Sequence, residues 1–308
     1  MRVAVVPDCP LERFVRIETG VLAAGPLEAT LIVAELTGNA LLCGRFQRGP
    51  AGVLRRAGGG RTVRAGAGTL GLLLYVPASG GLLPQPVPAD KVINRYVRGL
   101  LRGLAFAGTP AHYFGRDFVT ADHRQIARVS QDGTPDGGVL LEAIIAIQQR
   151  LAPDDTPSTD PRRDPPHVAL ADLTARTRRF DELADQLALG FAATFQQQRT
   201  AAEPPPEAEP PAAPPPVGQL HPAIAIPIGT LQGETAGADI ITAARLHGDF
   251  IATSFAIRAL EASLAGCPRD PAAIATRVDA ALLAPHAALL GADLAAVAAA
   301  FLSPDPRG

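Results

Sequence analysis

Length, composition and charge exclude several classes of protein. The 308 residues exceed the usual size of one hydrophobic core, so two domains are expected. A net charge of -2 argues against a nucleic-acid partner, and every apolar run is shorter than the ~18 residues that a membrane span needs. Early acidic residues and three scattered cysteines predict a cytoplasmic protein with reduced thiols and no metal site.

Strand-like and helix-like segments alternate through the first two thirds of the chain. Residues 29–36 and 39–46 are β-prone and apolar, which is typical of buried strands. Apolar side chains recur at helical spacing over residues 92–108 and again over residues 178–195. The pattern predicts an α+β domain that occupies residues 1–200.

Two proline-rich segments interrupt the chain. Residues 201–218, AAEPPPEAEPPAAPPPVG, lack many backbone donors and favour polyproline conformations, so they predict a semi-rigid linker. Residues 153–166 are polar and contain several prolines, which predicts an exposed loop inside the first domain.

The remaining residues, 219–308, predict a small α+β domain. Its expected strands lie in 223–233 and 238–253, and its expected helices in 254–266, 271–283 and 291–302.

A loop rich in arginine and glycine lies within residues 53–70. Consecutive glycines let backbone N–H groups approach an anionic or carbonyl-rich ligand, and adjacent arginines supply positive charge for a phosphate. A solvated run of charge is the alternative interpretation, and the neighbouring glycines favour binding. The candidate ligand-binding residues here are Arg55, Arg56, Gly58, Gly59, Gly60 and Arg61.

Three segments, in this order, resemble the lipoate-protein ligase family. Residues 38–50 are similar to a strand that ends in a Gly-Arg-x-Gln turn, with Gly44, Arg45 and Gln47 carrying the match. Residues 53–70 resemble the family's Arg-Arg-x-Ser-Gly-Gly-Gly-Ala-Val loop. The third segment, residues 94–132, resembles its Asn-Arg helix, its Gly-Arg-Asn-Asp turn and the hairpin that bears Arg-Lys-Ile-x-Gly. Looser similarity extends to residues 167–187 and 247–266.

The resemblance implies a fold like that of the biotin and lipoate ligases. This fold has a mixed, mostly antiparallel sheet with flanking helices, followed by a small α+β accessory domain. The loop nevertheless departs from the family pattern at three positions. Gly58 stands at the serine position, Arg61 at the third glycine and Ala65 at the histidine.

The turn and the hairpin also differ from the family pattern, and these differences matter most for the family's reaction. Arg116 matches the turn, whereas Asp117 stands where asparagine is usual. Gln125 occupies the position of the family's lysine, and Arg128 that of its glycine. In the family this lysine places positive charge beside the acyl carbonyl and the phosphate, which a glutamine cannot do. The only lysine of the chain, Lys91, lies before the Asn-Arg helix.

Two functional hypotheses follow from the resemblance. If the chain is active, it converts lipoate and ATP to lipoyl-AMP and transfers the lipoyl group to a lysine of a lipoyl acceptor domain, with Mg²⁺ left open. Gln125 or Arg128 would then replace the lysine, and Arg116 and Asp117 would surround the acyl carbonyl. Otherwise the chain is a pseudoenzyme that binds a lipoyl, acyl or nucleotide ligand, or lipoyl domains, without turnover. A third hypothesis is a complex whose partner subunit supplies the missing groups.

Other reactive or motif-like residues have simpler interpretations. Residues 66–71, GAGTLG, fit a dinucleotide fingerprint, but the strand-like LLLYVP that follows predicts a loop and the start of a strand. Cys43 lies inside an apolar strand, so we expect a small hydrophobic side chain and not a thioester nucleophile. We expect His123 to be a polar surface residue in a turn and not a general base, and His247 to have a capping or packing role.

Overall fold

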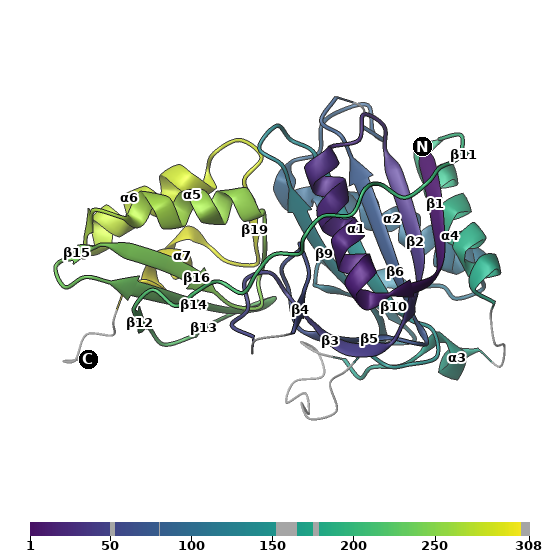
Figure 1. The fold of residues 1–308 in the computed structure, drawn as a ribbon, viewed down its shortest axis with the longest axis horizontal. Helices are drawn as coiled ribbons and strands as arrows, with labels where there is room; N and C mark the ends of the chain where they lie inside the picture. Colours follow the sequence, from purple (N-terminus) through teal and green to yellow (C-terminus); the bar gives the residue numbers. More distant parts are fainter. Residues whose placement is uncertain (50–52, 80, 152–164, 175–178, 303–308) are drawn as a thin grey trace.

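The computed structural model describes residues 1–49, 53–79, 81–151, 165–174 and 179–302. Figure 1 shows two units, an N-terminal unit of residues 1–200 and a C-terminal unit of residues 219–302, joined by an extended segment. None of the helices in the described ranges combines the length and the apolar character needed to cross a bilayer. Of the loop predicted over residues 153–166, residues 153–164 lie outside the described part.

An eight-stranded sheet forms the centre of the N-terminal unit, in the order β11-β1-β2-β6-β10-β9-β8-β7. Strand β1 runs parallel to β2 and β11, and the other neighbours are antiparallel. The mixed, mostly antiparallel sheet that was expected is therefore present. Its strands are β1 (Arg2–Pro10), β2 (Thr30–Thr37), β6 (Thr69–Val76), β7 (His112–Tyr113), β8 (Phe118–Ala121), β9 (Arg124–Gly133), β10 (Val139–Ala146) and β11 (Thr200–Ala201).

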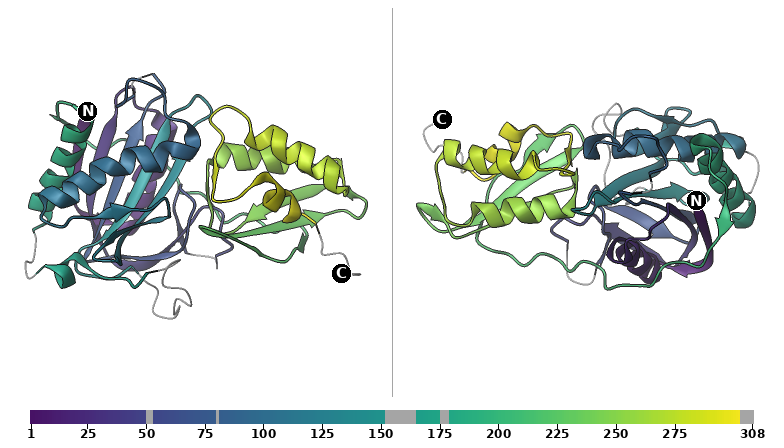
Figure 2. Two further views of the ribbon diagram at one scale, coloured as in Figure 1. Left: turned by 180° about the vertical axis from the view of Figure 1, so that it is seen from behind. Right: turned by 90° about the horizontal axis from the view of Figure 1, so that it is seen from above.

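Helices cover both faces of this sheet. Figure 2 shows α1 on one face and α2 on the other, and α4 packs beside α2. Because successive side chains of a strand point to opposite faces, Leu31 and Val33 of β2 join the cluster under α2 and α4, whereas Ile32 and Ala34 join the one under α1. The helices of this unit are α1 (Leu11–Ala24), η1 (Ala89–Lys91), α2 (Val92–Phe106), α3 (Leu170–Leu173) and α4 (Phe180–Phe195).

Helices α2 and α4 approach closely because glycines face each other at their contact. A Cβ atom built on Gly190 would lie 2.2 Å from the backbone nitrogen of Gly103. A Cβ on Gly99 would lie 2.3 Å from the ring of Phe191. The two predicted helices are thus confirmed, and their glycines set the distance between them.

A small second sheet, ordered β4-β3-β5, carries the arginine-glycine loop. It comprises β3 (Asn39–Cys43), β4 (Leu54–Arg55) and β5 (Val63–Gly66), and the loop connects the last two strands. The GAGTLG segment ends β5 and begins β6, as predicted, with positive φ angles of 141° at Gly66 and 84° at Gly68.

The C-terminal unit packs three helices against short strands around its own apolar cluster. The three predicted helices are confirmed in the predicted order. The two predicted strand segments each divide into shorter strands, and β12, β18 and β19 were not predicted. The strands are β12 (Gln219–Leu220), β13 (Ile224–Ile226), β14 (Gly229–Ala236), β15 (Ile240–Ile241), β16 (Ala243–His247), β17 (Ile251–Ala252), β18 (Cys267–Pro268) and β19 (Leu289–Leu290). The helices are α5 (Ser254–Leu264), α6 (Pro271–Leu282) and α7 (Leu294–Ala299).

The proline-rich segment, residues 202–218, lies against α1 and forms a strap between the two units. In Figure 1 this segment, drawn in green, crosses in front of α1. The amide of Ala208 donates to the carbonyl of Arg16 at 3.0 Å. The Arg16 side chain also pairs with Glu207 at 3.3 Å and with Glu209 at 2.8 Å, and Arg13 pairs with Glu207 at 3.1 Å. The segment is therefore held along the surface of α1.

Candidate functional site

The first arginine of the loop holds a neighbouring turn. Arg55 is 3% exposed, and its Nη1 atom donates to the carbonyl oxygens of Gly44 at 2.8 Å, Arg45 at 3.2 Å and Gln47 at 2.7 Å. Burial lowers the pKa of this guanidinium. One cation thus satisfies three carbonyls of the Gly-Arg-x-Gln turn, which places this turn against the loop.

The second arginine ties the loop to the central sheet. Arg56 is 1% exposed, and its Nη1 atom lies 3.3 Å from Oε2 of Glu142 on β10. Its Nη2 atom donates to the carbonyls of Gly59 at 3.2 Å and Arg61 at 2.7 Å. Both arginines that were expected to meet a phosphate therefore contact protein groups and shape the loop from within.

A carboxyl group of α1 supports the loop from below. Glu18 is fully buried, and its two oxygens accept the amides of Ala57 at 2.8 Å and Gly58 at 3.1 Å. Burial raises the pKa of Glu18 well above its usual range, and the nearby Glu142 raises it further. Glu18 was not among the expected site residues because α1 was not predicted, although Leu11, Phe14, Val15 and Val21 recur at helical spacing.

Gly58, which the sequence resemblance places at the family's serine position, has no room for a side chain. A Cβ on Gly58 would lie 2.3 Å from Oγ of Ser130. The Ser130 hydroxyl, which comes from β9, donates to the carbonyl of Gly59 at 2.9 Å. A hydroxyl from the sheet therefore occupies the space that a side chain at position 58 would need.

An ion-pair cluster joins the loop to the β8–β9 hairpin. Asp117 is 2% exposed, and its Oδ2 atom lies 2.6 Å from Nη1 of Arg128 and 3.6 Å from Nε of Arg61. The guanidinium of Arg128 also lies 5.7 Å from the centre of the Phe118 ring. Arg61 further approaches Asp249 of the C-terminal unit at 3.9 Å. The structure thus brings together Arg61, Asp117 and Arg128, which are far apart in the sequence.

Gln125, which the sequence resemblance places at the position of the family's lysine, is buried and hydrogen-bonded through its side chain and its backbone. It is 1% exposed, and its side-chain amide donates to the carbonyl of Pro165 at 2.7 Å. Its backbone amide donates to Pro166 at 2.8 Å, and its backbone pairs with His167. The side chain therefore secures the segment that follows the undescribed loop. Arg116, which was expected beside Asp117 at the ligand, instead donates to the carbonyl of Pro227 in the C-terminal unit.

The C-terminal unit lies on the glycine loop. The amide of Gly60 donates to the carbonyl of Phe250 at 2.7 Å, and the Phe250 ring stacks on Phe46 with centroids 4.7 Å apart. Asp132 of β9 accepts the amide of Ser254 at 2.7 Å, at the beginning of α5. Burial raises the pKa of Asp132. Both contacts fix the C-terminal unit against the strand and loop that carry the candidate residues.

The remaining candidates have structural surroundings of their own. Cys43 is 6% exposed on β3, and the Thr62 hydroxyl lies 3.6 Å from its sulfur. His123 is exposed in the β8–β9 turn, with a φ of 59°. His247 is 2% exposed and pairs with Glu234 at 2.8 Å, which confirms the expected packing role. Burial lowers the pKa of His247.

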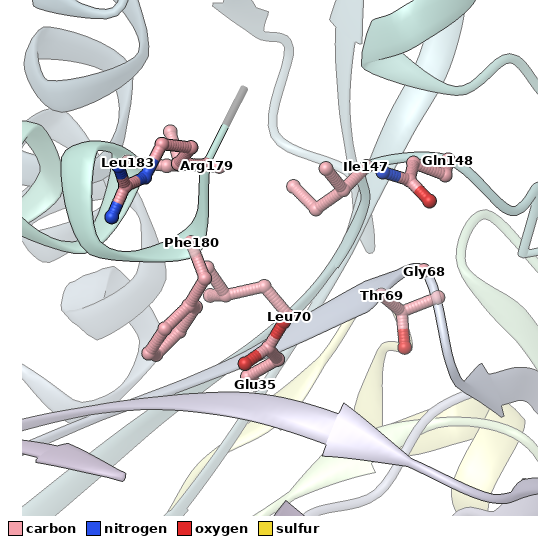
Figure 3. Close-up of a pocket in the computed structure, with 9 residues that line it drawn as sticks. All are labelled: Glu35, Gly68, Thr69, Leu70, Ile147, Gln148, Arg179, Phe180 and Leu183. Carbon is pink, nitrogen blue, oxygen red and sulfur yellow. The ribbon is translucent and has the colours of Figure 1, made fainter. Parts of the chain in front are cut away.

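A small cavity lies near the start of β6, where β2, β6 and α4 meet (Figure 3). Its volume is about 80 Å³, well below the roughly 300–1,000 Å³ of small-molecule pockets. We therefore assign it no ligand. It is lined by Glu35, Gly68, Thr69, Leu70, Ile147, Gln148, Arg179, Phe180 and Leu183.

Comparisons with known proteins identify the fold. The sequence matches no family model and no curated protein. The structure is similar to P. falciparum LipL1 in complex with lipoate, with a TM-score of 0.65 and 13% identity over 90% of this chain and 93% of that one. It is also similar to lipoate-protein ligase A bound with ATP, with a TM-score of 0.52 and 14% identity over 65% and 88% of the two chains. This chain has the lipoate-protein ligase fold.

A third neighbour has the same lipoate-protein ligase fold. It comes from Thermoplasma acidophilum and is described as a bipartite lipoate protein ligase with its E2 lipoyl domain. Its TM-score is 0.52, with 14% identity over 65% of this chain and 86% of that one. The expected fold, like that of the lipoate ligases, is confirmed.

Proposed function

We propose that this protein of the lipoate-protein ligase fold binds a lipoyl or related acyl ligand, or a lipoyl acceptor domain, and has lost efficient ATP-dependent transfer. One observation carries the proposal. At the position of the family's lysine, the neutral side chain of Gln125 is buried and donates to Pro165. It offers no positive charge to an acyl-adenylate, whose formation and transfer such a charge favours.

The other cations near the loop support the same proposal. Arg55 and Arg56 donate to protein carbonyls or to Glu142. Arg128 lies 2.6 Å from the Asp117 carboxylate, which offsets its charge. A phosphate at this site would therefore have to compete with groups that already hold these guanidinium groups.

One observation favours residual ligase activity as a second candidate function. The Arg61 side chain lies 3.6 Å from Asp117 and 3.9 Å from Asp249, and it is 23% exposed, compared with 6% for Arg128. Because Arg61 is the more exposed of the two, an incoming phosphate would reach it more easily than it would reach Arg128. In that case Arg61 would supply the charge that the family draws from its lysine, with ATP and lipoate as substrates.

The decisive experiment measures transfer directly. Purified protein is incubated with lipoate, ATP, Mg²⁺ and a lipoyl domain, and the mass of the acceptor is recorded together with AMP release. Wild type is expected to modify little of the acceptor, and Gln125→Lys is tested in parallel as a gain of function. Rapid stoichiometric modification by wild type would contradict the proposal and support the second candidate.

Binding is tested separately from turnover. Lipoate and ATP are each titrated while the unfolding temperature is followed, because a ligand that binds only the folded state raises it with concentration. We expect stabilisation by lipoate that Arg61→Gln reduces. The matched control is Arg150→Gln, which removes a surface pair with Asp172 and should leave the shift unchanged. If neither lipoate nor a lipoyl domain binds, the proposed function is wrong.

A further inference from the structure

A cavity lies beside the strap, between α5 and the turn that follows β3. Its volume is about 260 Å³, just below the roughly 300 Å³ at which small-molecule pockets begin. The strap runs from α1 to the C-terminal unit (Figure 1), and its residues 211–215 form one wall of the cavity. None of residues 55–61 of the arginine-glycine loop, all of which the structure describes, lines it. A ligand here would be small and would lie outside the candidate site.

Three arginines from separate elements line this cavity. Arg45 follows β3, Arg245 lies on β16 and Arg258 lies on α5. Among the described lining residues the only carboxylate is that of Glu261, three positions after Arg258 on the same helix. The lining therefore has a surplus of two positive charges. Asp132, which lies outside the lining and 3.8 Å from Arg45, reduces the surplus to one.

The neighbouring groups of the protein leave part of this charge without a partner. Arg245 pairs with Glu261 at 3.0 Å. Arg258 is exposed, and within the described ranges of the chain no hydrogen bond or ion pair engages its guanidinium group. Burial lowers the pKa of Arg45, Asp132 raises it, and the positive charge of Arg258 lowers it again. Two like charges that disfavour each other are both stabilised by a shared anion.

The chemistry of the lining suits a phosphate group. Arginine binds phosphate through several N–H donors held in a fixed plane. A phosphate group offers at least three acceptor oxygens and up to two negative charges, which matches three guanidinium groups and their surplus charge. Apart from Ser254 the other lining residues are apolar, and such walls strengthen an electrostatic attraction. They are Phe46, Leu246, Ile257 and the proline and alanine residues of 211–215.

We infer that this cavity binds a phosphate group, either inorganic phosphate or a small phosphate monoester, independently of the function proposed for the loop. The phosphate oxygens accept hydrogen bonds from Arg45 and Arg258, and Arg245 adds positive charge from beside Glu261. The walls of the cavity belong to the N-terminal unit, the strap and the C-terminal unit. The bound anion therefore strengthens the contact between all three.

Calorimetry on the full chain tests this binding, with the ionic strength held constant by chloride. Inorganic phosphate and glycerol 3-phosphate are titrated separately, and the tighter ligand identifies the source of the phosphate group. Arg258→Gln should weaken binding about tenfold, the lower end of the effect expected for a hydrogen bond to a charged group. The matched control is Arg277→Gln, which removes another exposed cation from a helix of the same unit, outside the cavity, and should leave binding unchanged.

Glu261→Gln should produce a change of the opposite sign. This substitution removes the carboxylate of the lining but keeps an oxygen that can accept the amide of Leu246. Phosphate binding should therefore tighten about two- to fivefold, as expected when one partly exposed charge is removed. Damage to the fold would weaken binding instead, and circular dichroism establishes that each variant is folded.

Three outcomes would overturn the inference. The first is failure of both phosphate compounds to bind the wild-type chain at millimolar concentration. The second is equal weakening by Arg258→Gln and Arg277→Gln, because binding would then depend on net charge alone. The third is weakening by Arg61→Gln without weakening by Arg258→Gln, which would place the phosphate at the arginine-glycine loop.

Discussion

The backbone amide of Gly60 donates a hydrogen bond of 2.7 Å to the carbonyl of Phe250. A Cβ on the preceding Gly59 would lie 2.3 Å from this same carbonyl oxygen. The loop can therefore meet the C-terminal unit only because position 59 lacks a side chain, while the φ of 92° at Gly60 is one that glycine adopts most easily. The contact places part of the C-terminal unit directly on the candidate site.

The stack of Phe46 on Phe250 is expected to hold this contact closed. Phe46 comes from the N-terminal unit but is 7% exposed and belongs to the apolar cluster of the C-terminal unit. Phe46→Ala should lower the free energy of unfolding by about 3–5 kcal/mol, the usual range for a buried phenylalanine. Hydrogen exchange at the Gly60 amide should accelerate. Phe114→Ala, at an exposed ring, is the control, and equal Gly60 protection in both variants would contradict the prediction.

The buried pair of Arg56 and Glu142 is expected to stabilise the fold strongly. Arg56→Met leaves Glu142 buried without its cation, and loss of one partner of such a pair costs about 3–5 kcal/mol. Denaturant unfolding measures the change. The matched control is Arg179→Met, whose pair with Asp181 is exposed and should contribute little. Similar destabilisation by the two substitutions would show that burial of Arg56 has no special effect.

Glu18 is expected to make stability depend on pH. Its pKa is higher in the folded protein than its ordinary value of 4.5, because burial and then Glu142 disfavour the charged form. Such a carboxyl stabilises the fold fully below its unfolded pKa, and the contribution is lost as pH rises through the folded pKa. The free energy of unfolding should therefore fall from about pH 4.5 upward in wild type, and less steeply in Glu18→Gln. The exposed Glu182→Gln should keep the wild-type slope, and identical slopes in all three proteins would refute this role.

The strap is expected to loosen when its arginine contacts are removed. Arg16→Ala eliminates the pairs with Glu207 and Glu209. Cleavage by a glutamate-specific protease after Glu207 should become about two- to fivefold faster, as expected for the loss of about 0.5–1 kcal/mol from exposed pairs. Arg199→Ala removes the pair with Asp185 and serves as the control. Unchanged cleavage in Arg16→Ala would mean that the backbone bond of Ala208 and the Arg13–Glu207 pair hold the strap without the Arg16 side chain.

Local patterns in the sequence account for most elements of the fold. The helical spacing over residues 92–108 and 178–195 corresponds to α2 and α4, since each must bury an apolar stripe against the sheet. The same pattern was present at residues 11–24 and predicts α1 equally well. Because α1 was not predicted, Glu18 was not recognised as a candidate residue. The packing of that helix against the loop explains why its carboxyl group is buried and accepts two loop amides.

The sequence by itself determined the α+β class, the arginine-glycine loop and the absence of a lysine from the β8–β9 hairpin, since these depend on residue type and local spacing. Only the tertiary structure decided which groups satisfy the arginines. Arg56 and Glu142 are 86 positions apart and meet because the strand order brings β10 beneath the loop. Asp117 likewise reaches Arg61 through the packing of a hairpin on a distant loop. The partner of a buried charge is the group of opposite charge that the fold brings within a few ångströms of it. The number of residues between the two groups in the sequence does not predict this distance.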